Sequence, residues 1–290
     1  MVTIIINPIS GGATPARARQ RAELAASLLA TRHEAGEVFV TERRGHGREL
    51  ADAAVRRRDR LVIAWGGDGT VNEVASALVG TETALGVVPA GSGNGLAREL
   101  RVPTKPAAAI ASACAAQARH VDAGQLGGRW FFSIAGLGFD AHVAQMFDRN
   151  IGRRGFATYV RITARELWQY RPGQFQINGA ASVAALLVTF ANSAQFGNGA
   201  RIAPGARIDD GLLDLVVFEE HSRLATLVGL PKLFTGGVER VRGVSIRQVT
   251  EAVVESSAPM LFHVDGEPHA SPTTRLEARV HPGVLRVAAP

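Results

Sequence analysis

The stretch that most constrains the fold is a short apolar run that ends in a glycine-rich turn. The run at residues 61–65 is Leu-Val-Ile-Ala-Trp, and the turn at residues 66–70 is Gly-Gly-Asp-Gly-Thr. Apolar, partly β-branched runs of this length are typical of buried parallel strands. Thr70 and Glu73 have the spacing of a capping box, which predicts a helix directly after the turn. We therefore expect a strand, a tight turn and a helix in immediate succession.

A glycine-rich turn in front of a helix is a favourable place for an anion. The missing side chains let backbone N–H groups approach a ligand, and the positive end of the helix dipole points the same way. Asp68 is unexpected beside a phosphate, and its carboxylate makes sense if it holds a metal ion, a sugar hydroxyl or a reacting proton. A plain strand-to-helix connection is the alternative, but the pattern favours a nucleotide phosphate.

Strands and helices alternate over the first part of the chain. Strand-like runs are expected at residues 3–6, 37–41, 61–65 and 84–88, and helical segments at residues 14–30, 47–57, 70–78 and 106–117. This alternation predicts a parallel sheet with right-handed crossovers and ligands at the carboxyl ends of the strands.

The pattern changes near His120, where short β-like runs separated by turns begin to dominate. The runs cover residues 120–125, 130–134, 183–190, 213–218, 253–255, 261–264 and 276–280, with helical segments at 141–169 and 222–234. We expect an α/β N-terminal domain with a parallel sheet, residues 1–121. A mostly antiparallel β domain with helical insertions should follow, residues 122–290, with its last residues packing back on the first domain.

Composition narrows the class of protein. The single cysteine, Cys114, excludes an internal disulfide and favours a reducing compartment, and no apolar stretch approaches the length needed to span a bilayer. The N-terminus reads as a strand and not as a secretory leader, so we expect a soluble, cytoplasmic protein. The net charge is +6, and arginine supplies nearly all of the positive charge, which suits phosphate or an anionic membrane surface. Only 6% aromatic residues, and arginines spread among acids, argue against nucleic acid.

Three loops of small residues follow predicted strands of the first domain. They lie at residues 7–12, 66–70 and 91–95 and read Asn-Pro-Ile-Ser-Gly-Gly, Gly-Gly-Asp-Gly-Thr and Gly-Ser-Gly-Asn-Gly. On one parallel sheet they would share an edge, where backbone N–H groups and the hydroxyls of Ser10, Thr70 and Ser92 could surround a polyphosphate. The chain has no P-loop motif and no Gly-x-Gly-x-x-Gly at its first helix, which argues against P-loop enzymes and ordinary dinucleotide dehydrogenases.

These motifs in this order resemble the diacylglycerol kinase catalytic-domain family of lipid kinases, which includes sphingosine and ceramide kinases and small soluble bacterial members. The resemblance continues through residues 136–140, 209–214 and 265–267, so it covers essentially the whole chain. The Gly-Gly-Asp-Gly core is also similar to that of the NAD kinases, so the implied fold of the first domain is NAD kinase/diacylglycerol kinase-like. In the third loop, Asn94-Gly95 stands where many bacterial members have Asn-Asp, and the loop is closer to the sphingosine kinase version.

The resemblance also implies roles for individual residues. The implied ATP contacts are Asn7, Ser10, Gly11, Thr41, Gly66, Gly67, Asp68, Gly69, Thr70, Asn72 and Ser92. A structural Mg²⁺ would be held by the Asp210 carboxylate and the carbonyls of Arg207 and Leu212. Asp265 matches the proton-accepting carboxylate, and Asp68, Asp265 and Glu267 are the candidates to hold catalytic Mg²⁺ and act as base. By residue type alone, Asp265-Gly266 and Asp210-Gly211 are also good hairpin turns.

The function this implies is transfer of the γ-phosphate of ATP to the hydroxyl of a diacylglycerol- or sphingosine-type lipid. A kinase of NAD or another small metabolite, and a non-catalytic lipid-binding or regulatory protein of the same fold, remain alternatives. The expected partner is a lipid at the inner face of the membrane, contacted peripherally and transiently, with no nucleic acid; a homodimer stays open. Residues 149–170 mix basic and apolar side chains and could lie on an anionic bilayer, although packing on the β domain is the commoner explanation. His142, His221 and His263 lack metal-ligand spacing, and we expect them to be structural.

Overall fold

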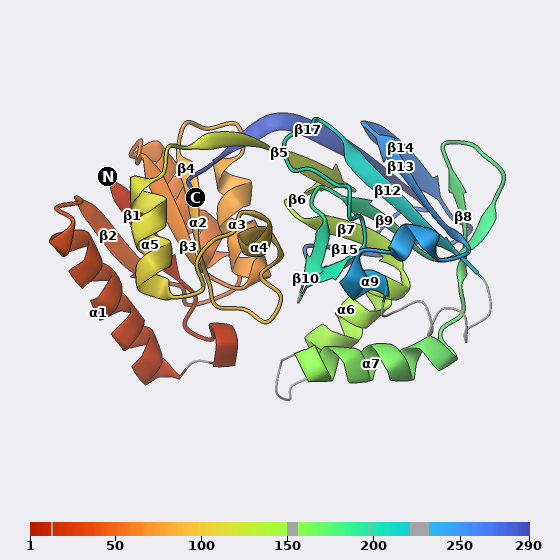
Figure 1. The fold of residues 1–290 in the computed structure, drawn as a ribbon, viewed down its shortest axis with the longest axis horizontal. Coiled ribbons are helices and arrows are strands. Elements are labelled where there is room, and N and C mark those ends of the chain that lie inside the picture. Colours follow the sequence, from red (N-terminus) through yellow and green to blue (C-terminus); the bar gives the residue numbers. More distant parts are fainter. Residues whose placement is uncertain (13, 150–155, 198, 221–231) are drawn as a thin grey trace. The chain divides into compact units, whose positions relative to one another are not determined.

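The computed structural model describes residues 1–12, 14–149, 156–197, 199–220 and 232–290. The chain divides into two compact units, Met1–Val121 with Gly283–Pro290, and Asp122–Pro282. Two strands, β5 (Arg119–Leu126) and β17 (Arg275–Val287), contain residues of both units. Figure 1 shows the order of the elements along the chain.

The first unit is a parallel sheet covered by helices on both faces. Its strands follow the order β2-β1-β3-β4, all parallel, and the end of β17 pairs with β4 through Val287 and Leu85. The strands are β1 (Val2–Ile6), β2 (Gly36–Val40), β3 (Leu61–Gly66) and β4 (Ala84–Pro89). Every residue of β1 and β3 is buried, as expected for strands with apolar side chains on both faces.

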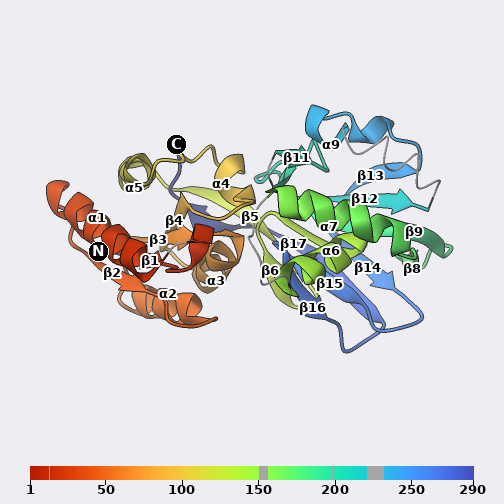
Figure 2. The same cartoon turned by 90° about the horizontal axis from the view of Figure 1, so that it is seen from below.

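The helices of the first unit separate the strands in the sequence. They are η1 (Ser10–Gly12), α1 (Pro15–Thr31), α2 (His46–Arg56), α3 (Asp68–Leu78), α4 (Gly95–Glu99) and α5 (Pro106–Ala115). Helices α1 and α5 contact each other, as do α2 and α3. Figure 2 shows α5 on one side of the sheet and α2 and α3 on the other. The core between these layers contains Ile4, Ile63, Trp65 and Ile110.

The register of the sheet places the ends of its strands together. Ile6 pairs with Val40 and with Trp65, and Gly66 pairs with Pro89. The chain segments that follow these four strands therefore leave the sheet at one edge, as the alternating pattern predicts.

The second unit is mostly antiparallel β structure with helices inserted. One path of neighbours runs β16-β15-β7-β9-β8-β14-β17, β12 joins β9 to β13, and β5 pairs with β6 and β17. These strands are β6 (Arg129–Phe131), β7 (Ile134–Gly138), β8 (Gly173–Ile177), β9 (Val183–Ala191), β12 (Leu213–Glu219), β13 (Val244–Val249), β14 (Glu251–Glu255), β15 (Leu261–Val264) and β16 (Glu267–Ala270). A two-stranded sheet of β10 (Gln195–Gly197) and β11 (Ala200–Arg201) accompanies them.

Four helical segments of this unit lie within the described residues. They are α6 (Phe139–Arg149), α7 (Phe156–Gln169), α9 (Lys232–Thr235) and η2 (Val238–Arg240). Figure 1 shows α6 and α7 side by side, and α6 contacts β7, β15 and β16. The unit's core contains Phe131, Leu137, Phe190, Leu215 and Val254.

Three sequence predictions about elements need comment. The expected helix at residues 141–169 is described as two helices, with residues 150–155 outside the described part of the chain. Most of the helix expected at residues 222–234, and His221, also lie outside the described residues. The prediction omitted β8, β10, β11, β13 and β16, and its run at residues 130–134 reached only the first residue of β7. Strand β13 is half-exposed or exposed along its length, so its mixed polar sequence carries little apolar periodicity.

Candidate functional site

The predicted ATP-contacting residues of the first unit gather at the carboxyl edge of the parallel sheet. The backbone N–H of Asn7 donates to the Trp65 carbonyl, Thr41 N–H to the Ile6 carbonyl, and Ala90 N–H to the Gly66 carbonyl, each at 2.8–2.9 Å. These bonds extend the ladder of the sheet into the loops. The sheet therefore holds the starts of all four segments in a fixed register.

The first loop is closed by its own polar groups. The Asn7 Oδ1 accepts from Ile9 N–H at 3.1 Å, and the Ser10 hydroxyl donates to the Asn7 carbonyl at 2.9 Å. Gly11 adopts a φ of 66°, in the left-handed region that glycine tolerates. Ser10 is buried, so its hydroxyl serves the shape of this loop in the present structure.

Arg21 supports the same loop, a role that is not apparent from the sequence. Its guanidinium donates to the Ser10 hydroxyl at 2.9 Å and to the Ser10 carbonyl at 3.2 Å, and it lies 5.8 Å from the Trp65 ring centroid. Burial, with a smaller contribution from the positive charge of Arg17, lowers the pKa of Arg21. An arginine in the middle of a predicted helix has no local pattern that distinguishes this role from an exposed charge.

The capping box predicted for Thr70 and Glu73 is wrong. Helix α3 begins at Asp68, with Gly67 at its N-cap and no side-chain cap. Thr70 lies inside the first turn, where its hydroxyl accepts from the Asn7 Nδ2 at 2.8 Å and joins the first two loops. The helix begins two residues earlier than expected because glycine serves as N-cap without a side chain.

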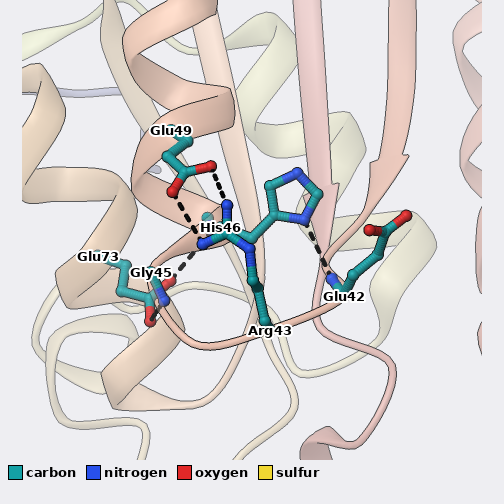
Figure 3. Close-up of polar contacts among 7 residues, drawn as sticks. Glu42, Arg43, Gly45, His46, Glu49 and Glu73 are labelled. Atoms are coloured by element: carbon teal, nitrogen blue, oxygen red, sulfur yellow. Dashed lines mark hydrogen bonds and ion pairs between the residues drawn. The ribbon is translucent and has the colours of Figure 1, made fainter.

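Glu73 reaches across to the loop that follows β2. Its carboxylate accepts from the N–H of Gly45, the N-cap of α2, at 2.8 Å, as Figure 3 shows. It also accepts from the N–H of Gly47, in the first turn of α2, at 3.1 Å. An exposed Arg43–Glu49 ion pair joins this loop to the first turn of α2, and the Glu42 N–H donates to His46 Nδ1 at 3.1 Å. Glu73 therefore fixes the segment directly after Thr41 to the helix that follows the main glycine loop.

Asp68 joins the second loop to the third. Its Oδ2 accepts from Asn94 N–H at 2.9 Å and its Oδ1 from Gly95 N–H at 2.7 Å. The two loops approach so closely that a Cβ on Gly91 would lie 2.6 Å from the Gly67 Cα. Burial raises the pKa of Asp68, although the N–H groups of Gly95 and Asn94 act in the opposite direction. The carboxylate that is unexpected beside a phosphate is thus offset by two N–H donors.

The accessible part of this edge lies near Gly69 and Ser92. Ser92 is exposed, and Gly67, Gly69 and Asn72 are half-exposed, whereas Gly66, Thr41 and Thr70 are buried. The first N–H groups of a helix such as α3 have no partner within the helix, and they point toward the helix N-terminus. Together with the glycine loops they can bind an anion without a basic side chain.

In the second unit, Asp265 and Gly266 form the two-residue turn between β15 and β16. Their φ angles are 47° and 83°, both left-handed, and Val264 pairs with Glu267 across the turn. The Asp265 carboxylate accepts from the N–H groups of three consecutive residues, Phe132 at 3.0 Å, Ser133 at 2.8 Å and Ile134 at 3.1 Å. The turn is thereby attached to the start of β7, with the half-buried Glu267 directly after it.

The predicted magnesium ligands lie in a turn before β12. Asp210 is exposed, and its Oδ1 accepts from Leu212 N–H at 3.1 Å, while Arg207 contacts Asp209 at 3.4 Å. Within the described residues, no three His, Cys, Asp or Glu side chains are placed to hold a metal ion together. A carboxylate with backbone carbonyls is nevertheless a donor set that suits Mg²⁺, which prefers oxygen ligands and keeps several waters.

Two further carboxylates lie near this turn. The Gly211 N–H donates to Asp122 Oδ2 at 2.6 Å. Burial, with a contribution from the negative charge of Asp210, raises the pKa of Asp214 to about 6. A cation beside Asp210 would relieve this accumulation of negative charge, so the residues present fit the predicted metal.

Asn192 connects the Asp210 turn to the Asp265 turn. Its Nδ2 donates to the carbonyls of Asp122 and Phe132, both at 3.0 Å. Asp122 holds the first turn and Phe132 the second, so one buried amide spans both. This role of Asn192 is not apparent from the sequence, because an asparagine after an apolar strand resembles an ordinary loop residue.

Comparison with known proteins agrees with the sequence motifs. Residues 1–126 match the family model described as diacylglycerol kinase catalytic domain, and residues 133–289 match the one described as YegS C-terminal NAD kinase beta sandwich-like domain. A protein of Chromohalobacter salexigens named "Probable lipid kinase YegS-like" is 34% identical over 87% of this chain and 83% of its own length. A "Diacylglycerol kinase" of Mycobacterium tuberculosis is 31% identical over 88% of this chain and 84% of its own.

A solved structure has the same fold. A crystal structure described as that of a diacylglycerol kinase from Bacillus anthracis strain Sterne superposes with a TM-score of 0.73, covering 100% of this chain and 96% of the other, at 18% identity. Among the described residues, no helix combines the length and the apolar character that crossing a membrane requires.

Proposed function

Because the chain belongs to the diacylglycerol kinase catalytic-domain family, and is thus a kinase, we propose that it transfers the γ-phosphate of ATP to a lipid hydroxyl. The acceptor we propose is a diacylglycerol- or sphingosine-type lipid. The observation that carries the proposal is the edge of the parallel sheet, where Thr70 and Asp68 tie the three glycine loops to one another. Glu73 ties the segment after Thr41 to the same edge.

ATP binding is supported by the chemistry of this edge. Glycine loops and the first turn of α3 offer N–H groups, which suit phosphate oxygens, and Ser92 adds an exposed hydroxyl. Phosphoryl transfer needs little covalent work from the protein, because most of the rate enhancement comes from positioning and charge stabilisation. Loops locked by Asp68 and Glu73 supply that positioning.

Two sites for Mg²⁺ belong to the proposal. A bound Mg²⁺ would offset negative charge on the β- and γ-phosphate oxygens, and Asp68, Asp265 and Glu267 are the candidates either to hold that ion or to act as base. Asp210, with the carbonyls of Arg207 and Leu212, would hold a second, structural ion. Three N–H donors orient the Asp265 carboxylate, and we propose that this carboxylate takes the proton of the lipid hydroxyl, with Glu267 as the alternative.

The described part of α7 supports action at a membrane. Arg161, Arg165 and Trp168 are exposed and recur at helical spacing, and Trp168 is 51% exposed. Leu167 is buried against Phe139 and anchors the helix from its other side. Tryptophan favours the membrane interface, and each arginine near an anionic surface contributes about 1 kcal/mol. We propose that α7 places the protein on the inner, cytoplasmic face of the membrane.

Vesicle sedimentation tests the membrane proposal. The double variant Arg161→Glu/Arg165→Glu should lose binding to vesicles that contain phosphatidylglycerol, and Trp168→Ala should weaken it. Arg56→Glu/Arg58→Glu makes the same charge change at exposed arginines of the first unit and serves as the matched control. Equal loss in both double variants would mean that net charge, and not α7, determines binding.

A labelled-ATP assay with defined acceptors tests the function itself. Wild-type protein with Mg²⁺ should label diacylglycerol or sphingosine in vesicles and leave NAD unlabelled. Transfer to NAD alone would make the protein a metabolite kinase, and ATP binding without transfer to any lipid would favour a non-catalytic role.

A further inference from the structure

Three buried, hydrogen-bonded side chains lie beside the Asp265-Gly266 turn, and none of them belongs to the proposed catalytic or metal-binding residues. They are Asp140 in the first turn of α6, Thr189 on β9 and His263 on β15, with exposures of 4%, 0% and 2%. Burying an ionisable group is costly unless its polar atoms are hydrogen-bonded, so these contacts need an explanation.

The Asp140 carboxylate is well satisfied. Its Oδ1 accepts from Ala141 N–H and its Oδ2 from the Thr189 hydroxyl, both at 2.8 Å. Space for it depends on Gly136, because a Cβ there would lie 2.0 Å from the Asp140 Oδ2. Burial, followed by the effect of the nearby Asp140 carboxylate, raises the pKa of Tyr170 to about 12. The Gly-x-Gly-x-Asp motif therefore places a hydrogen-bonded carboxylate inside the unit.

The contacts of His263 define its tautomer. Gly266 N–H donates to Nδ1 at 3.3 Å, so Nδ1 carries a lone pair and no proton. A neutral ring then has its proton on Nε2, which lies 3.3 Å from the Asp140 Oδ2. The order of donation runs from Gly266 N–H to His263, and from His263 and Thr189 to Asp140. Asp140 thus selects the ring orientation that presents Nδ1 to the turn.

We propose that His263 is a positioning residue for the turn that carries Asp265. The side chain of Asp265 is held by the N–H groups of residues 132–134, and the backbone of the next residue, Gly266, is held by His263. The turn is therefore fixed from two sides, once at the carboxylate and once at the peptide that follows it. The catalytic consequence rests on the proposed function, in which Asp265 takes the proton of the acceptor.

Two substitutions separate the two contacts of His263. Asparagine places its Oδ1 near the position of Nδ1 and keeps an acceptor for Gly266, whereas glutamine reaches the position of Nε2 and keeps a donor for Asp140. His263→Asn should retain kcat within about threefold, and His263→Gln should lower kcat about tenfold, the equivalent of one lost hydrogen bond, with KM for ATP unchanged.

Amide exchange at Gly266, measured by NMR on the whole protein, gives a readout that does not depend on activity. Exchange should stay slow in wild type and His263→Asn and accelerate about tenfold in His263→Gln. Thr3→Val, which removes the buried Thr3–Asp59 hydrogen bond in the first unit, is the control for lost stability without a positioning effect.

Activity, Tm and Gly266 exchange together distinguish a positioning role of His263 from a merely structural one. If His263→Asn and His263→Gln lose the same activity, in proportion to a lowered Tm as in Thr3→Val, the positioning role is wrong. Unchanged Gly266 exchange in His263→Gln would also overturn it. If wild type transfers phosphate to no lipid, the proposed function fails, and the exchange rates still decide whether His263 holds the turn.

Discussion

Asp68 and Asp265 both accept hydrogen bonds from backbone N–H groups, but the two carboxylates join different kinds of structure. Asp68 lies at the start of a helix and holds two residues of another loop of the sheet edge, Asn94 and Gly95. Asp265 lies in a hairpin turn and is held by three residues that lead into a neighbouring strand. The Asp68 carboxylate holds two loops together, whereas the Asp265 carboxylate is held in place by the backbone of another segment.

This difference assigns separate consequences to the two residues. Loss of Asp68 should loosen the loop that carries Ser92 and so affect the nucleotide. Loss of the charge on Asp265 should leave nucleotide binding intact and affect transfer, provided that the turn keeps its shape. The two kinetic constants can therefore be separated by substitution.

The largest effect is expected for Asp265→Asn. Asparagine has the shape of aspartate and keeps one acceptor for the N–H groups, but it cannot take a proton. Lipid-dependent kcat should fall about 10²–10⁴-fold, the usual contribution of a positioned base, while the Kd for ATP stays unchanged. Turnover close to wild type would remove Asp265 from the mechanism and direct attention to Glu267.

A smaller effect, on a different constant, is expected for Asp68→Ala. The N–H groups of Asn94 and Gly95 would lose their acceptor, at about 1–3 kcal/mol each, and ATP affinity should fall about 10- to 100-fold. Isothermal titration with ATP measures this directly. If ATP affinity is kept and only transfer is lost, Asp68 acts in the chemistry and not in holding the third loop.

Glu73 and Glu49 offer a matched pair around one loop. Glu73→Ala removes the acceptor for Gly45 and Gly47 N–H and should raise KM for ATP about 3- to 10-fold. Glu49→Ala removes only an exposed ion pair with Arg43, which contributes little, so KM should not change. Equal changes in both variants would show that the loop responds to charge and not to the backbone contacts of Glu73.

The smallest effect concerns pH. Burial raises the pKa of Asp68 above its ordinary value of 3.8. At pH values between 3.8 and this raised pKa, the folded protein therefore binds more protons than the unfolded chain. The free energy of unfolding should therefore fall as pH rises through this window, and the fall should be absent in Asp68→Asn. Chemical denaturation in metal-free buffer from pH 4 upward measures the slope. An identical slope in both proteins would mean that its two N–H donors fully compensate the burial of Asp68.

The sequence predicted the sheet edge better than the contacts that make it rigid. An apolar run, a glycine turn and helical periodicity are local patterns, so the parallel sheet and the gathering of the loops at one edge follow from them, whereas the strand order does not. The acceptor role of Asp68 toward Asn94 and Gly95 could not be predicted, because backbone donors leave no trace in side-chain identity. For the same reason, Glu73 fits a local capping box and in fact serves a distant loop.

In the second unit, the sequence predicted the hairpin turn but not the buried residues that hold the turn in place. Asp265-Gly266 is a strong hairpin pattern, and the structure has the hairpin. His263 and Asp140 are 123 positions apart, and only the pairing of β15 with β7, which precedes α6, brings them together. Such buried pairs depend on tertiary register, which a single sequence does not specify.

The central claim, transfer of the γ-phosphate of ATP to a lipid, is tested most directly by the position of a label. Wild-type protein is incubated with diacylglycerol or sphingosine vesicles, Mg²⁺, and ATP labelled at either the γ- or the α-phosphate, and the extracted lipid is identified by mass. We expect label in the lipid from γ-labelled ATP and none from α-labelled ATP. Label from the α-position, or no labelled lipid from either nucleotide, would contradict the claim.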